Sequence, residues 1–184
     1  RGYALPSQEI RTLIHRGELL VPEIQPGASL EAIAESSVEA RIQPASFDST
    51  LGEEVFELDT GETLFRPDAQ EQVYRSLLRN LPKNQRRASS IHNGYELRRG
   101  YTYLLPLQER VVVPPGFHLR ASPKSTPGRI FLNSRLLADY HGSYDEILPR
   151  GNIPLNLWLM VQPLAFNAII KPGLRLNQLR PFFG

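Results

Sequence analysis

Short hydrophobic runs, rich in β-branched and aromatic side chains, dominate most of this sequence and predict β-strands. Turn-forming proline and glycine separate the runs, as at residues 114–116 and 171–173. The predicted strands lie within residues 38–42, 53–59, 94–107, 110–122, 129–140, 153–173 and 174–183. With 16 prolines and 13 glycines spread along the chain, the pattern favours an all-β sandwich or barrel over a helical bundle.

Helical spacing of hydrophobic residues occurs at three places. A helix is predicted after a cap at Pro6-Ser7, with Gly17 as its stop and Ile10, Leu13 and Ile14 on its buried face. A second helix is predicted after Asp68 as its cap, and a short helical turn over residues 29–37. The buried face of the second helix contains Val73, Leu77, Leu78 and Leu81, ahead of Pro82. Residues 82–90, PKNQRRASS, are interpreted as a basic solvated loop in which Arg86-Arg87 is a solvated charge pair.

The composition narrows the class of protein. Hydrophobic residues make up 41% and charged residues 22% of the 184, as in ordinary soluble domains, and a net charge of +2 does not indicate a nucleic-acid coat. The chain has no cysteine, which excludes disulfides and thiolate–metal sites, and its four histidines lack the paired spacing of a metal site. No run of 18 apolar residues is present, so no membrane span is expected and the cytoplasm is the expected location. The only methionine is Met160, and we expect the sequence to be a segment of a longer protein.

One stretch, ASPKSTPGR at residues 121–129, stands out for its chemistry. It holds two cations and two hydroxyls on a stiff corner between prolines and a glycine. A polar turn that only reverses the chain explains this composition, and so does a pocket floor for an anionic ligand. The spacing is not that of a P-loop, because the Gly-x-x-x-x-Gly-Lys pattern is missing.

Three elements, in this order and at these distances, resemble a known family. They are IQPASFDSTLG at 42–52, SPKSTPGR at 122–129 and PLAFNAIIKPGLRLNQLRPF at 163–182. Together they resemble the deoxycytidine triphosphate (dCTP) deaminases of the deoxyuridine triphosphatase superfamily, and most closely the N-terminal module of the long, two-module bacterial form. The resemblance implies a distorted β-barrel or jelly-roll, with two or three short helices near the N-terminus. It also implies a homo-oligomer, either a trimer or a pseudo-trimer of fused modules.

With this resemblance we expect a single module over 1–184. A helical N-terminal arm would occupy residues 1–40, and a β-barrel residues 41–184, with a helical insertion near 68–81. The implied reaction is hydrolytic removal of the cytosine amino group of dCTP, giving deoxyuridine triphosphate (dUTP) and ammonia for thymidylate supply. Nucleic acid and membrane are not expected partners.

The resemblance also implies site residues. Ser125 would position the attacking water or bond the exocyclic group, Arg129 would stabilise charge at C4, and Lys124 would hold the triphosphate together with turn N–H groups. The other implied substrate-binding residues are Thr126, Leu136 and Ala138 (the latter two through backbone groups to the cytosine edge), Asp145 (deoxyribose hydroxyl) and Gln178 (triphosphate). Asp48 matches an early aspartate with a structural or subunit-contact role. The family works without zinc, and Mg²⁺ would arrive with the triphosphate.

The sequence departs from the family at its catalytic glutamate. Depending on one gap, that position is Leu159 or Met160, and neither side chain carries a proton. Three explanations stay open: a degenerate half that supports an active second module, a site completed by Asp139, Asp145 or Glu146, or a module that binds nucleotide without turnover. A deoxyuridine triphosphate pyrophosphatase is a weaker alternative, because the aspartate-bearing hairpin and glycine-rich tail of that branch are not evident. Trp158 and Met160 are expected to pack in a core or against another module.

Overall fold

The computed structural model describes residues 3–4, 7–59, 65–124 and 132–183. Within these ranges the helical elements are α1 (Ser7–His15), α2 (Leu30–Ala34), the 3-10 helix η1 (Ser37–Arg41), α3 (Val73–Asn80) and the 3-10 helix η2 (Lys83–Gln85). The strands are β1 (Tyr3–Ala4), β2 (Leu19–Leu20), β3 (Phe47–Ser49), β4 (Glu54–Leu58), β5 (Arg86–Ser90), β6 (Tyr95–Leu97) and β7 (Thr102–Val111). They continue with β8 (Phe117–Pro123), β9 (Leu132–Ala138), β10 (Glu146–Ile147), β11 (Leu155–Pro163), β12 (Ala168–Ile170) and β13 (Asn177–Phe183).

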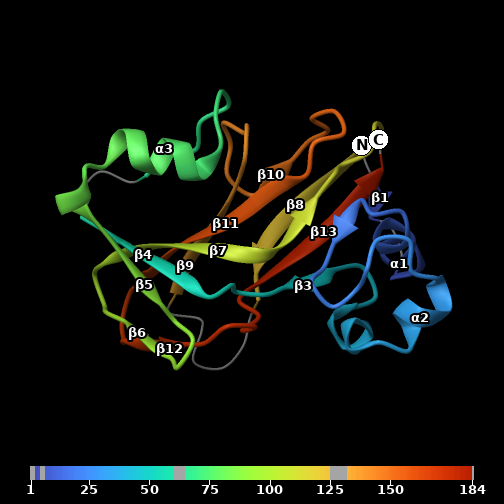
Figure 1. Ribbon diagram of the computed structural model, residues 1–184, viewed down its shortest axis with the longest axis horizontal. Coiled ribbons are helices and arrows are strands. Elements are labelled where there is room, and N and C mark those ends of the chain that lie inside the picture. Colours follow the sequence, from blue (N-terminus) through green and yellow to red (C-terminus); the bar gives the residue numbers. More distant parts are fainter. Residues whose placement is uncertain (1–2, 5–6, 60–64, 125–131, 184) are drawn as a thin grey trace.

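The strands form two main antiparallel sheets and a small ribbon (Figure 1). The first sheet has the order β1-β13-β8-β10, with β3 also paired to β13. The second has the order β5-β4-β7-β11-β9, with β2 also paired to β7, and β12 pairs with β6 in the ribbon. The predicted mainly β fold with short helices is confirmed. Across the described residues these ladders stay open and do not close into a barrel.

Local structure differs from the sequence-based prediction at three places. Residues 38–42 were expected as a strand, but η1 covers most of them. Residues 86–90 form β5 and not a loop, because they pair along the whole of β4. The second helix begins at Val73, five residues after the expected cap, and the Asp68 carboxylate instead accepts a hydrogen bond from Gln70 N (2.7 Å).

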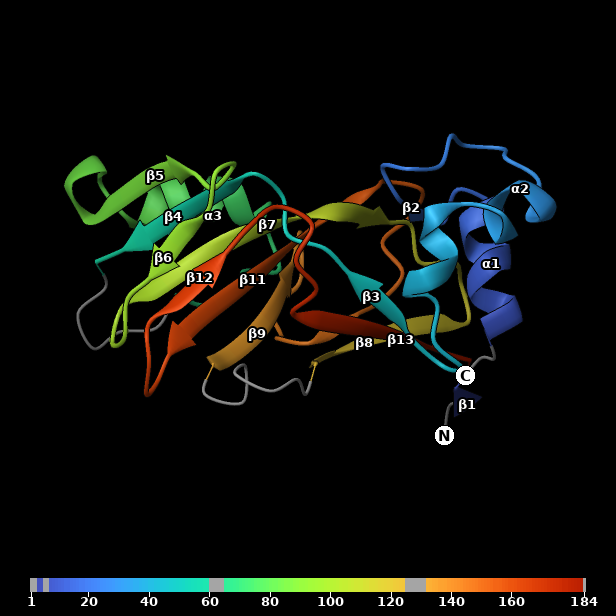
Figure 2. The ribbon, with the colours of Figure 1, turned by 90° about the horizontal axis from the view of Figure 1, so that it is seen from below.

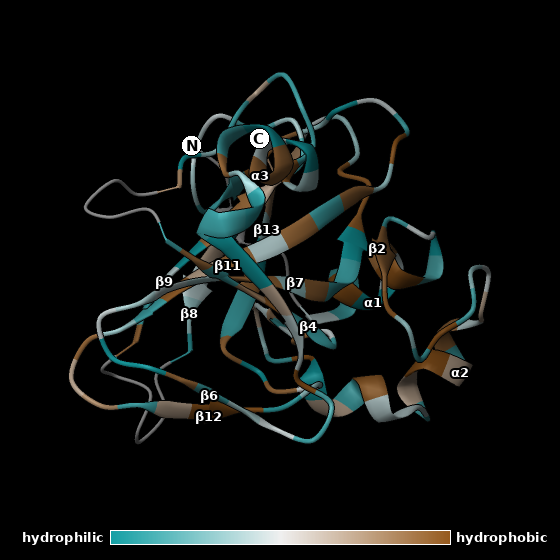
Figure 3. Ribbon diagram, turned by 60° about the vertical axis from the view of Figure 1, so that its left-hand side comes forward, coloured by the Kyte–Doolittle hydropathy of each residue, from teal (hydrophilic) through white to brown (hydrophobic). Residues whose placement is uncertain are grey.

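Strand β11 of the six-stranded sheet is buried on both faces, which explains its continuous hydrophobic run LWLMV. Leu157, Leu159 and Val161 belong to the main core, which also includes the buried face of α1. Trp158 and Met160 point the other way, into a second core covered by α3, as expected from the sequence. Helix α3 has both hydrophobic and hydrophilic residues (Figure 3), and its buried positions include Val73 and Leu77. Leu78, which was predicted on the buried face, is instead 40% exposed.

A buried ionic network joins the N-terminal region to the six-stranded sheet. Arg41 Nη1 lies 2.9 Å from Glu109 Oε2, and both side chains are almost fully buried. The other oxygen of Glu109 accepts from Thr50 N (2.7 Å), and Thr50 Oγ1 donates to Glu109 Oε2 (2.6 Å). Arg41 also forms an ion pair with Glu23 and stacks over the Phe47 ring at 4.7 Å. Every charge in the centre of this network therefore has a partner.

Candidate functional site

The described residues that the sequence singled out lie on β9 and β13, directly after β8 and directly before β10, where the two sheets contact each other through β8 and β9. Figure 2 shows β8 beside β13 and β9 beside β11. Lys124 directly follows β8, and Leu132 begins β9. Ser125, Thr126 and Arg129, which the sequence predicts for the polar chemistry, lie outside the described residues.

Lys124 forms an ion pair with a buried aspartate. Its Nζ lies 2.5 Å from Asp48 Oδ2, and the Asp48 side chain is 0% exposed. Arg175 Nη1 lies 3.6 Å from the same oxygen, so two cations face one carboxylate. Asp48 Oδ1 is buried and has no hydrogen-bond partner among the described residues. In this state Asp48 neutralises Lys124, and a phosphate would have to compete for that lysine.

Gln178 lies next to this pair. On β13 it is opposite Asp48 of β3 on one side and Ser122 of β8 on the other. Its Nε2 donates to Ser122 Oγ (3.2 Å), and its Oε1 accepts from Ser46 Oγ (3.3 Å). The half-buried amide is thus held in one orientation by two hydroxyls, beside the Lys124–Asp48 pair.

Asp145 pairs with the backbone of Leu136 on the edge strand β9. Leu136 N donates to Asp145 Oδ1 (2.7 Å), and Asp145 N donates to Leu136 O (2.9 Å). Arg135 Nε lies 2.8 Å from Asp145 Oδ2, and burial raises the pKa of this carboxyl above its usual range. Asp145 has a positive φ of 64°, a conformation that aspartate tolerates better than most residues. The backbone groups of Leu136 that were predicted to meet cytosine are therefore occupied by Asp145, while Ala138 is buried beside Leu157 of β11.

A single strand links these two groups of residues. Asp145 O accepts from Ala121 N of β8 (2.9 Å), and Lys124 follows Ala121 by three residues, about 10 Å along a strand. Strand β8 thus lies between the Lys124–Gln178 pair and the Asp145–Leu136 contact.

The two possible positions of the missing glutamate lie on opposite faces of β11. Leu159 pairs with Leu136 of β9 and faces the main core, 0% exposed. Met160 pairs with Arg135 and lies in the second core under α3, 2% exposed. Leu159 is the one that shares a face with Leu136 and Ala138. At either position the side chain is apolar and sealed from water.

The comparison with known proteins identifies the family. Residues 3–184 match the family described as 2'-deoxycytidine 5'-triphosphate deaminase (DCD) N-terminal domain. The chain belongs to this family. No curated protein matches it.

A solved structure has a fold similar to that of this chain. The crystal structure of 2'-deoxycytidine 5'-triphosphate deaminase from Agrobacterium tumefaciens matches with a TM-score of 0.79 and 25% sequence identity. The match covers 100% of this chain and 48% of that chain, so this dCTP deaminase N-terminal domain spans about half the length of the solved protein. The resemblance inferred from the three sequence elements is confirmed.

Of the three carboxylates that could replace the glutamate in this domain, Asp139 has a structural role. Both oxygens of Asp139, which is almost fully buried, accept backbone hydrogen bonds, one from Val73 N and one from Asn156 N (3.0 Å each). Asp139 therefore caps the first turn of α3, where Gln72 gives no side-chain cap. Glu146 lies on β10, opposite Arg120 of β8. Asp145 is the remaining carboxylate, and it contacts the backbone of Leu136 as described above.

His141 is a buried neutral histidine with a structural role. Its Nε2 accepts a hydrogen bond from Leu148 N (2.8 Å), and its Nδ1 lies 2.8 Å from Asp139 O, to which Nδ1–H donates. Burial is the largest cause that lowers the pKa of His141 below the ordinary value of 6.5. A protonated ring could not accept from Leu148 N, so the fold requires the neutral form.

Stability is therefore expected to decrease as the pH falls below about 6.5, because the unfolded chain then binds a proton that folded His141 does not. The loss continues down to the lowered folded pKa, with a slope of at most about 1.4 kcal/mol per pH unit from this group. Urea unfolding between pH 5 and 7.5 measures it. His141→Gln should flatten this part of the profile, and His92→Gln, at a solvent-exposed histidine, should leave it unchanged. An unchanged slope in His141→Gln would assign the pH dependence to other groups.

Three residues of this region were not predicted from the sequence: Ser46 and Ser122, which orient Gln178, and Asn177. The Asn177 side chain is fully buried, and neither of its polar atoms has a hydrogen-bond partner among the described residues. Asn177 is two positions before Leu179 on the same strand, so the sequence pattern could have placed this polar side chain on the inward face. Ser122 and Ser46 are 56 and 132 residues away from Gln178, so no local sequence pattern predicts these hydrogen bonds.

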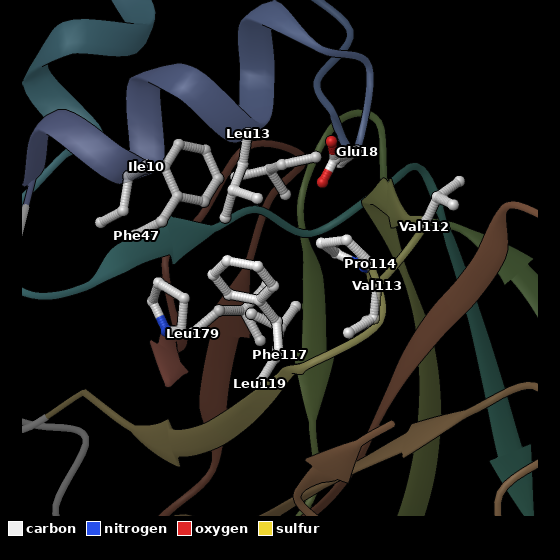
Figure 4. A pocket seen from close by; sticks show the side chains of 12 residues that line it. Ile10, Leu13, Glu18, Phe47, Val112, Val113, Pro114, Phe117, Leu119 and Leu179 are labelled. Carbon is white, nitrogen blue, oxygen red and sulfur yellow. The ribbon is translucent and has the colours of Figure 1, made fainter. Parts of the chain in front are cut away.

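An apolar cavity under α1 is separate from these residues (Figure 4). Ile10, Leu13, Phe47 and Phe117 line it, and its volume of about 20 Å³ is that of one water molecule. Glu18 lies at its rim, and burial raises the pKa of its carboxyl. The cavity is too small for a nucleotide.

The described part of the chain contains neither a candidate metal-binding cluster nor a candidate membrane-spanning helix. No group of three or more His, Cys, Asp or Glu side chains there is arranged to hold a metal ion. No helix in the described ranges has the length and apolar character needed to cross a membrane.

Proposed function

We propose that this domain is the N-terminal module of a two-module dCTP deaminase and supports the reaction without supplying its proton carrier. The parent protein would convert dCTP and water to dUTP and ammonia. The observation that carries this proposal is the sealed, apolar environment of Leu159 and Met160 on β11. A general acid/base must reach the reacting groups, and neither side chain has a proton to move.

The remaining polar residues suit substrate contact. Lys124, Thr126 and Gln178 would meet the triphosphate. The ion pair of Lys124 with Asp48 would be exchanged for one with phosphate. Ser125 would position water and Arg129 would stabilise the charge that develops at C4. Mg²⁺ would travel with the triphosphate, bound mainly by phosphate oxygens and water. The proton carrier would come from the second module.

We also propose an oligomeric assembly and a cellular location for the parent protein. Two such modules in one chain would pack with their copies as a pseudo-trimer or a trimer, so that a loop of one module completes the pocket of another. The reaction uses soluble deoxynucleotides, and we place it in the cytoplasm.

The test compares the parent protein with this domain alone. Incubation with dCTP and Mg²⁺, followed by chromatography of nucleotides and an ammonia assay, should show equimolar dUTP and ammonia for the parent protein only. Arg129→Ala in the parent should reduce kcat/KM by about 10²-fold or more, as for loss of a group that stabilises transition-state charge. Arg16→Ala, at an exposed arginine on the N-terminal arm, is the matched control. Unchanged kinetics in Arg129→Ala would contradict the assignment of this module to the site.

A second candidate function is deamination by this domain itself, with Asp145 as the proton carrier. It is favoured by the raised pKa of the half-buried Asp145 carboxyl beside β9. Equimolar dUTP and ammonia from the folded domain alone, abolished by Asp145→Asn, would establish it and overturn the first proposal.

A further inference from the structure

A polar groove lies at the edge of the six-stranded sheet opposite β9. The end of β4, the η2–β5 segment and the turn before β7 form its walls, and its volume is about 730 Å³. In the sheet order, β7 and β11 separate β4 from β9. These walls lie at the left of Figure 1, where β4 ends and β5 begins. The groove shares no lining residue with the Lys124–Gln178 site.

Three cations line the groove and have no ion-pair partner among the described residues: Lys83, Arg86 and Arg87. Arg86 Nε donates to Leu81 O (2.9 Å), which fixes the position of its guanidinium. The carboxylates of Glu57 and Asp59 also line the groove, leaving one net positive charge. Glu57 lies opposite Arg87 in the β4–β5 ladder, yet the two side chains form no ion pair. Among the described residues, no ion pair of these cations has to break before an anionic ligand binds.

An aromatic side chain completes the lining. Tyr101, just before β7, is 46% exposed. An exposed tyrosine ring presents a face on which a planar base stacks, whatever the identity of that base. Cations that line one groove, together with an aromatic platform, form a combination that recognises a nucleotide.

We propose that this groove binds a nucleoside polyphosphate at a site separate from the candidate functional site. Lys83, Arg86 and Arg87 would contact the phosphates, and Tyr101 the base. A volume of about 730 Å³ lies in the range of small-molecule sites. The two carboxylates favour a short ligand over a nucleic-acid strand, because a continuous phosphate backbone would pass both of them. This inference is independent of the proposed function.

Calorimetric titration of the parent protein tests it with two probes, inorganic tripolyphosphate and deoxyadenosine triphosphate (dATP), which lacks the cytosine group. Arg87→Ala and Lys83→Ala should each weaken both probes about tenfold, as for one charge-assisted contact. Tyr101→Ala should weaken dATP several-fold and leave tripolyphosphate unchanged. Glu57→Gln should tighten both probes, because it removes a like charge from the groove.

Two controls separate this groove from other sources of binding. Lys124→Ala separates the two sites, because it removes only the dATP binding that uses the Lys124–Gln178 site and leaves the binding in the groove. Arg16→Ala, at an exposed arginine outside the groove, should leave dATP affinity unchanged. The proposal fails if Arg87→Ala binds both probes normally, if Arg16→Ala loses as much as Arg87→Ala, or if Lys124→Ala alone abolishes binding. Tighter binding of a single-stranded oligonucleotide than of dATP would also overturn it, in favour of a nucleic-acid surface.

Discussion

Leu159→Glu is expected to destabilise this domain by about 3–5 kcal/mol at pH 7, the cost of leaving an unpaired charge in a protein interior. Leu159 is 0% exposed and packs in the main core beside Leu136 and Val161. Among the described residues, the only buried arginine or lysine is Arg41, and it is already paired with Glu109 and Glu23. The new glutamate would therefore have a pKa raised by burial, and lowering the pH toward 5 should recover part of the lost stability.

Urea unfolding at pH 7 and pH 5 measures both effects. Leu159→Met is the matched control, because a hydrophobic replacement of similar volume costs less than about 1.5 kcal/mol. A stable Leu159→Glu variant at pH 7 would mean that water or a cation reaches this position. This face of β11 could then accommodate a catalytic glutamate.

Arg41→Met is expected to cost about 3–5 kcal/mol of folding free energy, since it leaves Glu109 buried without its cation. The double variant Arg41→Met/Glu109→Met should recover much of that loss, because it removes both charges and fills the space with apolar atoms. A double-mutant cycle by urea unfolding gives the coupling energy.

The half-exposed pair of Arg11 with Glu39 provides the comparison for this cycle. Arg11→Met should cost less than about 1 kcal/mol, because solvent screens that pair. Equal losses at Arg41 and Arg11 would show that burial of the Glu109 network adds nothing to its contribution.

Hydrophobic patterning predicted what depends on neighbours in the chain. The hydrophobic run within residues 153–173 predicted a strand, which β11 confirms, and Trp158 and Met160 pack in the second core as expected. The start of α3 could not be predicted in the same way, because the side chain that caps it is Asp139, 66 residues from Val73. Residues 38–42 have strand-forming side chains, but η1 places Arg41 against Glu109, and that tertiary pairing overrides local propensity.

The candidate site shows the same division. The resemblance selected Lys124 and Gln178, and the structure brings both to the β8–β13 region. The resemblance did not reveal that Asp48, 76 residues from Lys124, forms an ion pair with it. Nor did it reveal that Asp145 forms hydrogen bonds with the backbone of Leu136. These pairings depend on which strands become neighbours, which periodicity alone does not determine.

The contact between Asp145 and Leu136 has a consequence for how copies of the domain meet. β9 is the outer strand of its sheet, and an open strand edge is a template to which another chain can add a strand. Here an aspartate in a left-handed turn takes both backbone groups of Leu136, and Arg135 adds charge beside it. The domain is thereby protected at this point from edge-to-edge aggregation, and modules that associate there must do so through their side chains.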